Sequence, residues 1–183
     1  MKMKDSISYQ DVHDLLDFAL SEFFNNDSVL LDYKTEKDAV AERCMVFHIG
    51  WYMLEKIKTL GKFKGFNIDC EYNRNFSHPK SMYKETYEGI QQKIKDTYPD
   101  LIIHKRRSND ENLVVMEFKK GRAEKTARDQ DIEKLIYFTN PENEYRYKYG
   151  FYLELYKKKY AKIKVFQDGK EMGSLNYKFE VTT

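Results

Sequence analysis

Two short apolar runs joined by a polar turn limit what this chain can fold into more than any other feature. Residues 101–104 read LIIH and residues 112–118 read NLVVMEF, and the segment RRSNDE at 106–111 is rich in turn formers. β-Branched and apolar residues on both sides of such a turn are typical of a β-hairpin. The runs contain few polar positions, which indicates strands that are buried within a sheet.

Periodicity and turn signals elsewhere predict helices on either side of this hairpin and more strands after it. Helices are expected over residues 8–24, 35–61, 82–95 and 127–138. Strands are expected over residues 66–72 and 149–156, and a second hairpin is expected over residues 161–181 with its turn at Asp168–Gly169. This order predicts the α/β class, with a mixed sheet flanked by helices.

The second helix is expected to begin near Thr35, because Thr35 and Asp38 resemble a capping pair. It should end near Gly61 and turn one apolar face toward the core. The residues on that face are Val40, Cys44, Phe47, Trp51, Leu54 and Ile57.

Length and composition exclude several classes of protein. The chain has 183 residues, which suits one domain with a substantial core, and 41% of them are hydrophobic. No apolar run approaches the roughly 18 residues of a membrane span, and the charged start MKMKDSISYQDVHDLL lacks the apolar centre of a signal peptide. Cys44 and Cys70 are isolated, as is usual in a reducing compartment. We therefore expect a cytoplasmic protein without a membrane segment.

The net charge of +2 gives no argument for nucleic acid by itself. Basic residues do gather in three short runs, HKRR, FKKGR and YKKKYAK. Such runs are most often solvated faces, so they gain functional meaning only where they surround a site.

The first hairpin places two acids side by side if its turn is centred between Ser108 and Asn109. Leu101 to Ile103 then lie beside Val114 to Met116, and His104 faces Leu113. In this register Asp100 lies opposite Glu117, and opposed residues of an antiparallel pair have Cβ atoms only about 4.5–5.5 Å apart. Lys119 follows two residues after Glu117 and projects from the same face of the strand.

Two carboxylates and one ammonium group would thus converge at one end of the sheet. Hard oxygen ligands in this arrangement suit Mg²⁺, which can lower the pKa of a bound water and offset charge on a phosphodiester. The alternative is a strand pair with charged ends and a salt bridge to Lys119. Acid-x-Lys triplets are common in this chain, but only Glu117-Phe-Lys119 ends an apolar strand that follows a Pro-Asp strand start.

At Pro99-Asp100 and Glu117-Phe118-Lys119 the chain resembles the PD-(D/E)xK nuclease superfamily, which includes restriction endonucleases and Holliday-junction resolvases. The resemblance implies a restriction-endonuclease-like core at 35–156, within one domain over 1–183. An N-terminal helical extension at 1–34 and a C-terminal hairpin at 157–183 would be additions to it. Asp100 and Glu117 would then bind Mg²⁺ or Mn²⁺, and Lys119 would position the hydrolytic water.

Members of the superfamily often add a glutamate from the helix before the first core strand. Glu42 is the candidate for this role, and Glu71, near the end of the first core strand, is the alternative; a solvated helix glutamate explains Glu42 equally well. Basic residues around the expected site would contact the phosphates of DNA without reading its sequence. These residues are Arg74, Lys105, Lys120, Arg122 and Lys134, although Lys134 and Asp131 also suit an ordinary intrahelical pair.

The expected function is therefore metal-dependent hydrolysis of phosphodiester bonds in DNA. The alternative is a binding module of the same fold, inactive as an enzyme, that holds nucleic acid or a protein partner. Near-zero net charge and the lack of a dedicated DNA-binding segment favour the alternative. Many members of the superfamily dimerise to cut both strands, so the resemblance also allows a homodimer.

Overall fold

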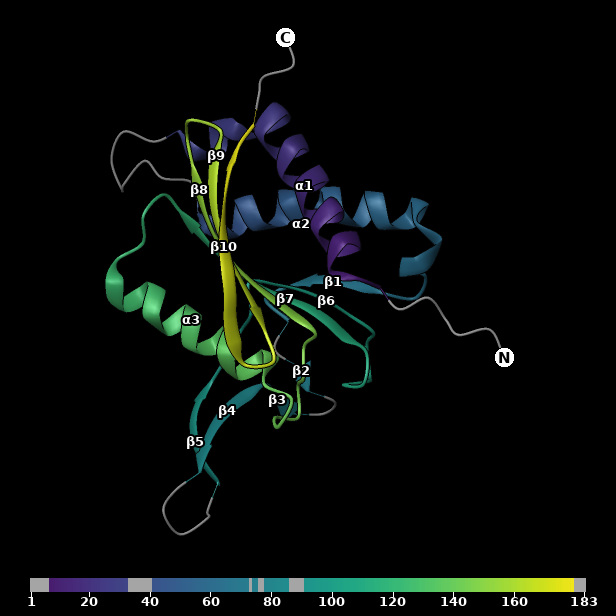
Figure 1. Cartoon of the computed structure of the whole chain (residues 1–183), viewed down its shortest axis with the longest axis vertical. Coiled ribbons are helices and arrows are strands. Elements are labelled where there is room, and N and C mark those ends of the chain that lie inside the picture. Colours follow the sequence, from purple (N-terminus) through teal and green to yellow (C-terminus); the bar gives the residue numbers. More distant parts are fainter. Residues whose placement is uncertain (1–6, 33–40, 73, 76–77, 86–90, 180–183) are drawn as a thin grey trace.

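A six-stranded mixed sheet forms the centre of the computed structural model, which describes residues 7–32, 41–72, 74–75, 78–85 and 91–179. Its strand order is β1-β6-β7-β8-β9-β10, and only β7 and β8 pair in parallel (Figure 1). These strands are β1 (Asn67–Cys70), β6 (Leu101–His104), β7 (Asn112–Lys120), β8 (Tyr149–Tyr156), β9 (Tyr160–Gln167) and β10 (Lys170–Lys178). The predicted α/β class is confirmed.

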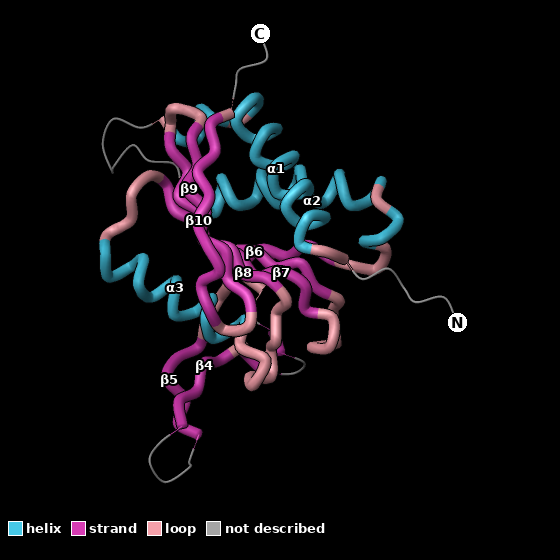
Figure 2. Tube along the Cα trace, viewed as in Figure 1, coloured by secondary structure: helices cyan, strands magenta, loops and turns pink. Residues whose placement is uncertain are grey.

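Helices cover both faces of this sheet (Figure 2). One face carries α1 (Tyr9–Asn26) and α2 (Glu42–Thr59), and the other carries α3 (Lys125–Thr139). Two 3-10 turns, Ser28–Leu31 and Gly61–Phe63, follow α1 and α2. None of the described helices is long and apolar enough to cross a membrane.

The hairpin register predicted from the sequence is confirmed over three residue pairs. Leu101 pairs with Met116, Ile102 with Val115 and Ile103 with Val114. The expected pairing of His104 with Leu113 is wrong, because a bulge shifts His104 opposite Asn112. This shift leaves the His104 Nε2 atom 2.8 Å from Asp69 on the neighbouring β1, a buried polar contact that supports the bulge.

Alternate residues of β7 enter two separate cores. Val114, Met116 and Phe118 pack in the core that α1 and α2 cover, whereas Val115 packs in the core under α3. Glu117 follows the alternation and points toward α3, where Lys134 contacts it. A strand buried on both faces therefore carries a charged side chain into the smaller core.

The helix α1 begins at a capping box, in which Ser8 and Asp11 exchange side-chain and backbone hydrogen bonds. Its buried side chains share one core with α2 and with β9 of the C-terminal hairpin. The expected N-terminal extension, nuclease-like core and C-terminal hairpin thus contribute to a common hydrophobic core. The boundaries between these parts, at residues 34 and 156, stay a prediction.

The helix α2 begins at Glu42, so the expected start near Thr35 is wrong; Thr35 and Asp38 lie outside the described residues. Ala41 is extended, with φ −56° and ψ 141°, and precedes the first helical residue. The expected apolar face is also wrong in part, because Phe47 and Trp51 are exposed. The buried face of α2 is rotated about the helix axis relative to the expected face. It consists of Met45, Val46, Ile49, Gly50, Met53 and Ile57.

The helix expected over residues 82–95 is wrong, because the described residues of this range form two strands, β4 (Ser81–Glu85) and β5 (Gln91–Asp96). The ribbon projects away from the sheet (Figure 1). Hydroxyl groups of two tyrosines accept hydrogen bonds from backbone N–H groups of β4, Tyr145 from Ser81 at 2.8 Å and Tyr137 from Tyr83 at 3.1 Å. These contacts outweigh the helical spacing of the sequence. A shorter pair, β2 (Arg74–Asn75) and β3 (His78–Pro79), precedes it.

The later elements agree with the sequence. The helix α3 includes the predicted residues 127–138, and β8 has the predicted bounds. The turn of the C-terminal hairpin is Asp168–Gly169, and both residues have positive φ, as the tightest hairpin turns require.

A methyl group added at Gly150 of β8 should destabilise the fold. The new Cβ would lie 3.0 Å from Thr139 Cγ2 and 3.2 Å from Phe166 Cβ, because α3 packs closely there. We expect Gly150→Ala to lower the free energy of unfolding by ~1–3 kcal/mol in urea titrations. Gly173→Ala is the matched control, since a Cβ on that strand residue meets nothing within 4 Å. Equal stability of the two variants would contradict the packing described.

Candidate active site

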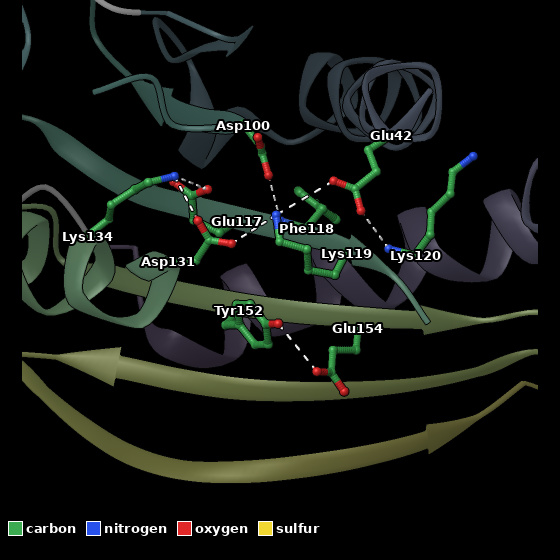
Figure 3. Close-up of polar contacts among 10 residues, drawn as sticks. All are labelled: Glu42, Asp100, Glu117, Phe118, Lys119, Lys120, Asp131, Lys134, Tyr152 and Glu154. Atoms are coloured by element: carbon green, nitrogen blue, oxygen red, sulfur yellow. Dashed lines mark hydrogen bonds and ion pairs between the residues drawn. The ribbon is translucent and has the colours of Figure 1, made fainter. Parts of the chain in front are cut away.

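Asp100, Glu117 and Lys119 meet at one end of the sheet, as predicted (Figure 3). Asp100 directly precedes β6, whose pairing with β7 begins at Leu101 and Met116. Glu117 and Lys119 follow Met116 on β7 and turn toward α3, where both contact residues of that helix. The hairpin register is thus what brings the three side chains together.

Asp100 is held by the backbone of the neighbouring strand. Its Oδ2 atom accepts a hydrogen bond of 2.7 Å from the Phe118 N–H. Burial raises the pKa of Asp100, although this hydrogen bond and the nearby Lys119 act in the opposite direction. The carboxyl group is therefore fixed in place and costly to ionise.

Glu117 is the most constrained acid of the site, with 1% of its surface exposed. Burial raises its pKa well above the ordinary value of 4.5, and the charge of Asp100 raises it further. Lys134 of α3 offsets part of this effect, with its Nζ atom 3.0 Å from Glu117 Oε2. The other oxygen, Oε1, is buried and has no hydrogen-bond partner in the described structure. An unsatisfied buried oxygen of this kind is unfavourable unless a cation or a donor reaches it.

Lys119 lies between two carboxylates. Its Nζ atom is 2.9 Å from Asp131 Oδ2 and 3.6 Å from Glu42 Oε2. Burial alone would lower the pKa of Lys119, but Asp131, Glu42 and Asp100 together raise it. The lysine is therefore charged and oriented as a donor rather than free to act as a base.

Glu42, expected as the supporting acid, does lie at the site. As the first residue of α2 it reaches the end of β7, where its Oε1 atom accepts a 3.0 Å hydrogen bond from the Lys120 N–H. Glu71, the alternative, follows β1 with a positive φ and lies 3.8 Å from Arg43. Of the two, only Glu42 contacts Lys119.

An open groove gives solvent access to three of the acids near the site. It lies between the start of α2 and the end of β1, and its walls include Glu42, Glu71 and Asp100. Arg43, Phe47 and Cys70 complete the part of the wall that faces solvent. A ligand in this groove would contact Asp100, whereas Glu117 is buried and does not line the groove.

The five basic residues expected around the site have separate locations. Lys134 belongs to the site itself, whereas Lys105 lies at the far end of β6 and pairs with Glu111, so its expected place is wrong. Lys120 turns to the opposite face, where its Nζ atom donates to the Leu30 carbonyl at 2.8 Å. Arg122 follows β7 in a separate groove near the start of α3. Arg74 lies in β2, and its side chain is outside the described part.

Sequence reasoning gave no role in the site to Asp131, which is 5% exposed and contacts both lysines. Its Oδ1 atom is 2.8 Å from Lys134, as an ordinary intrahelical pair requires. A second buried acid, Glu154 of β8, pairs in register with Lys119 and accepts hydrogen bonds from Tyr152 and Tyr156. The sequence shows the i, i+3 spacing of Asp131 and Lys134, but it does not show which face of α3 packs against the sheet.

Two carboxylates of the site, Asp100 and Glu117, are the oxygen ligands that could hold a hard divalent cation. Within the described ranges, no group of three or more His, Cys, Asp or Glu side chains is arranged to hold a metal ion. Asp100 and Glu117 are adjacent, and Glu117 Oε1 lacks a partner, so a cation there would relieve both the repulsion and the unsatisfied oxygen. Lys119 and Lys134 already neutralise part of the charge.

Comparison of the chain with protein-family models finds no match, and comparisons with curated proteins and with solved structures find none either.

Replacing Glu117 by glutamine should remove a pH-dependent cost. The folded protein binds the Glu117 proton more tightly than the unfolded chain does, so the contribution of Glu117 to stability falls as pH rises from about 4.5 toward its raised pKa. Glu117→Gln lacks this titration, and its advantage should grow at up to ~1.4 kcal/mol per pH unit through the window above pH 4.5. Urea unfolding from pH 4 to pH 8 measures the difference. A variant less stable than wild type throughout would show that the Lys134 ion pair dominates.

Proposed function

We propose that this protein is a metal-dependent phosphodiesterase that cleaves DNA, with a site of the PD-(D/E)xK type. The observation that carries the proposal is the placement of Glu117. This buried acid has a raised pKa and an unsatisfied oxygen, stands beside Asp100, and shares a strand face with Lys119. Stability alone gives no reason to bury an acid there, because an apolar residue at the same place would avoid the cost.

The chain's residues divide the chemistry in a simple way. Asp100 and Glu117 would hold Mg²⁺ or Mn²⁺, which supplies an activated water and offsets phosphate charge. Lys119, charged and held by Asp131 and Glu42, would donate hydrogen bonds to the attacking water or to a phosphate oxygen. Asp131 and Glu42 act as positioning residues through Lys119, and Lys134 balances the charge of Glu117.

The order of elements supports a restriction-endonuclease-like fold. Helix α2 is followed by β1, then by the β6–β7 hairpin, then by α3 and the parallel strand β8. This is the order helix, strand, strand, strand, helix, strand, with the β2–β5 region inserted. A cytoplasmic location and a homodimer remain part of the same proposal.

A binding module is the second candidate, and the ion-pair network favours it. The acidic and basic side chains of the site form a connected series of ion pairs in which the charges alternate. In order, the series is Glu117, Lys134, Asp131, Lys119 and Glu42. Such a network can persist without a metal ion. In that case the fold would hold nucleic acid or protein without cutting it.

Thermal unfolding tests metal binding directly. Mn²⁺ or Mg²⁺ at ~100 times its dissociation constant should stabilise the wild type by ~2.7 kcal/mol, since the ion binds only the folded state. Asp100→Asn should abolish the shift while it keeps the hydrogen bond to Phe118. Asp168→Asn in the exposed hairpin turn is the control and should respond like the wild type. An unchanged shift in Asp100→Asn would reject the metal site.

Cleavage assays separate the enzyme from the binding module. With Mn²⁺ present, the wild type should cut at least one of supercoiled, branched and single-stranded DNA. Lys119→Ala should lower the rate by a factor of ~10² or more, as loss of a positioned charged donor does in other active sites. Lys170→Ala, an exposed lysine on β10, is the matched control. Absence of cleavage by the wild type, or equal cleavage by Lys119→Ala, would favour the binding module.

A further inference from the structure

The solvent-facing side of α2 carries a row of large side chains. Arg43, Phe47 and Trp51 follow one another at intervals of four residues, so they lie on one face of the helix. The side chain of Arg43 is 75% exposed, and Phe47 and Trp51 are 58% and 51% exposed. We call these three residues the α2 row.

Exposed aromatic rings at this spacing are unusual within the described part of the chain. The other exposed aromatic residues of the described part, Tyr83 and Tyr98, lie on separate segments, β4 and the loop before β6. Phe47 and Trp51 are two aromatic rings one helical turn apart, about 6 Å along the axis. The core does not need them, because the opposite side of α2 supplies its buried residues.

The α2 row leads into the candidate site. Arg43 and Phe47 form part of the wall of the groove that also contains Glu42 and Asp100. Trp51 continues the row one turn beyond the groove. A linear ligand lying along α2 would therefore pass Trp51 and Phe47 before it reached the carboxylates.

We propose that unpaired nucleotides of a DNA strand stack on Phe47 and Trp51 and that the row guides this strand into the groove. Every base has a flat π face, and stacking on aromatic side chains binds single strands with little sequence preference. Bases inside an intact duplex are stacked on one another and do not offer that face. This inference rests on the proposed function and narrows its substrate to DNA with a single-stranded segment.

Charge plays a smaller part in this surface than stacking does. Arg43 lies 3.8 Å from Glu71, and Lys58, whose Nζ atom is 5.9 Å from the centre of the Trp51 ring, pairs with Glu55. Exposed pairs of this kind contribute little, so both cations can turn to phosphates. Two phosphate contacts predict a shallow salt dependence, with a slope of log K against log salt of about −1.4 for a single strand.

Trp51 is the one tryptophan of the chain, so its fluorescence reports on the row without labelling. The experiment titrates Glu117→Gln protein, in EDTA, with oligo-dT, with a blunt duplex, and with a duplex that has a single-stranded overhang. We expect quenching by oligo-dT and by the overhang, and at least tenfold weaker binding of the blunt duplex. Phe47→Ala should weaken binding of oligo-dT roughly 5- to 150-fold, the change that ~1–3 kcal/mol per stacked base corresponds to.

Control variants keep the result specific to stacking. Phe47→Tyr keeps a flat ring and should bind as the wild type does. Met172→Ala removes an exposed apolar side chain from β10 and should leave binding unchanged. The exposure of Phe47 means that its replacement should not unfold the protein, which a melting curve checks.

Three outcomes would overturn the inference. Equal affinity for oligo-dT and blunt duplex, or an unchanged affinity in Phe47→Ala, would show that the row does not stack on bases. Quenching that depends on protein concentration alone, with a doubled mass in light scattering that Phe47→Ala abolishes, would show that the row binds a second copy.

The test also separates this inference from the proposed function. Binding of single strands that depends on Phe47, without any cleavage by the wild type in Mn²⁺, would support the stacking surface and reject the nuclease. Cleavage that keeps its rate and substrate preference in Phe47→Ala would support the nuclease and reject the stacking surface.

Discussion

A carboxylate buried between the sheet and α3 is the constraint on which the site depends. Glu117 enters the smaller core because β7 alternates between two faces, and the strand offers it no solvent. Lys134 of α3 offsets part of the cost of a negative charge on Glu117, and Lys134 in turn is held by Asp131. The ion pairs therefore fix the position of α3 on the sheet at the same place where the acids meet.

The same constraint leaves the site with an unfavourable group at its centre. Lysine side chains from two elements approach the acids, yet one oxygen of Glu117 stays unsatisfied. Burial raises the pKa of this acid, so loss of its proton needs a partner stronger than Lys134. In the proposed nuclease a divalent ion would supply such a partner.

Much of the central fold could be predicted from the sequence because its signals are local. The register of β6 and β7 follows from the apolar runs and the turn between them, and β8 is a continuous apolar strand. Prediction failed where tertiary contacts decide. Tyrosine hydroxyls from a distant loop and from α3 stabilise β4 as a strand. The buried face of α2 is shifted by about one residue from the face expected from the sequence, so Phe47 lies outside the core.

For the site, sequence reasoning found the residues that lie at strand and helix ends and missed those that depend on helix orientation. Asp100, Glu117 and Lys119 follow from register, whereas Glu42 was expected only because the resemblance implies a glutamate from the helix before the first core strand. Lys105 was expected at the site but follows β6, whereas Asp100 precedes it, so the two residues lie at opposite ends of the strand. A run of basic residues in the sequence does not indicate which end of a strand lies near the acids. The role of Asp131 needed the docking angle of α3, which no spacing encodes.

The projecting β4–β5 ribbon has a consequence for how this chain could diversify. Two of its attachments use main-chain N–H groups of the ribbon and phenol groups of the body, and the Tyr145 hydroxyl also donates to the Ser81 carbonyl. Bonds of this kind do not depend on the side chain of the ribbon residue that donates them. The exposed Tyr83 side chain can therefore be replaced while the base of the ribbon keeps its position, whereas Met82 next to it is buried and must stay apolar.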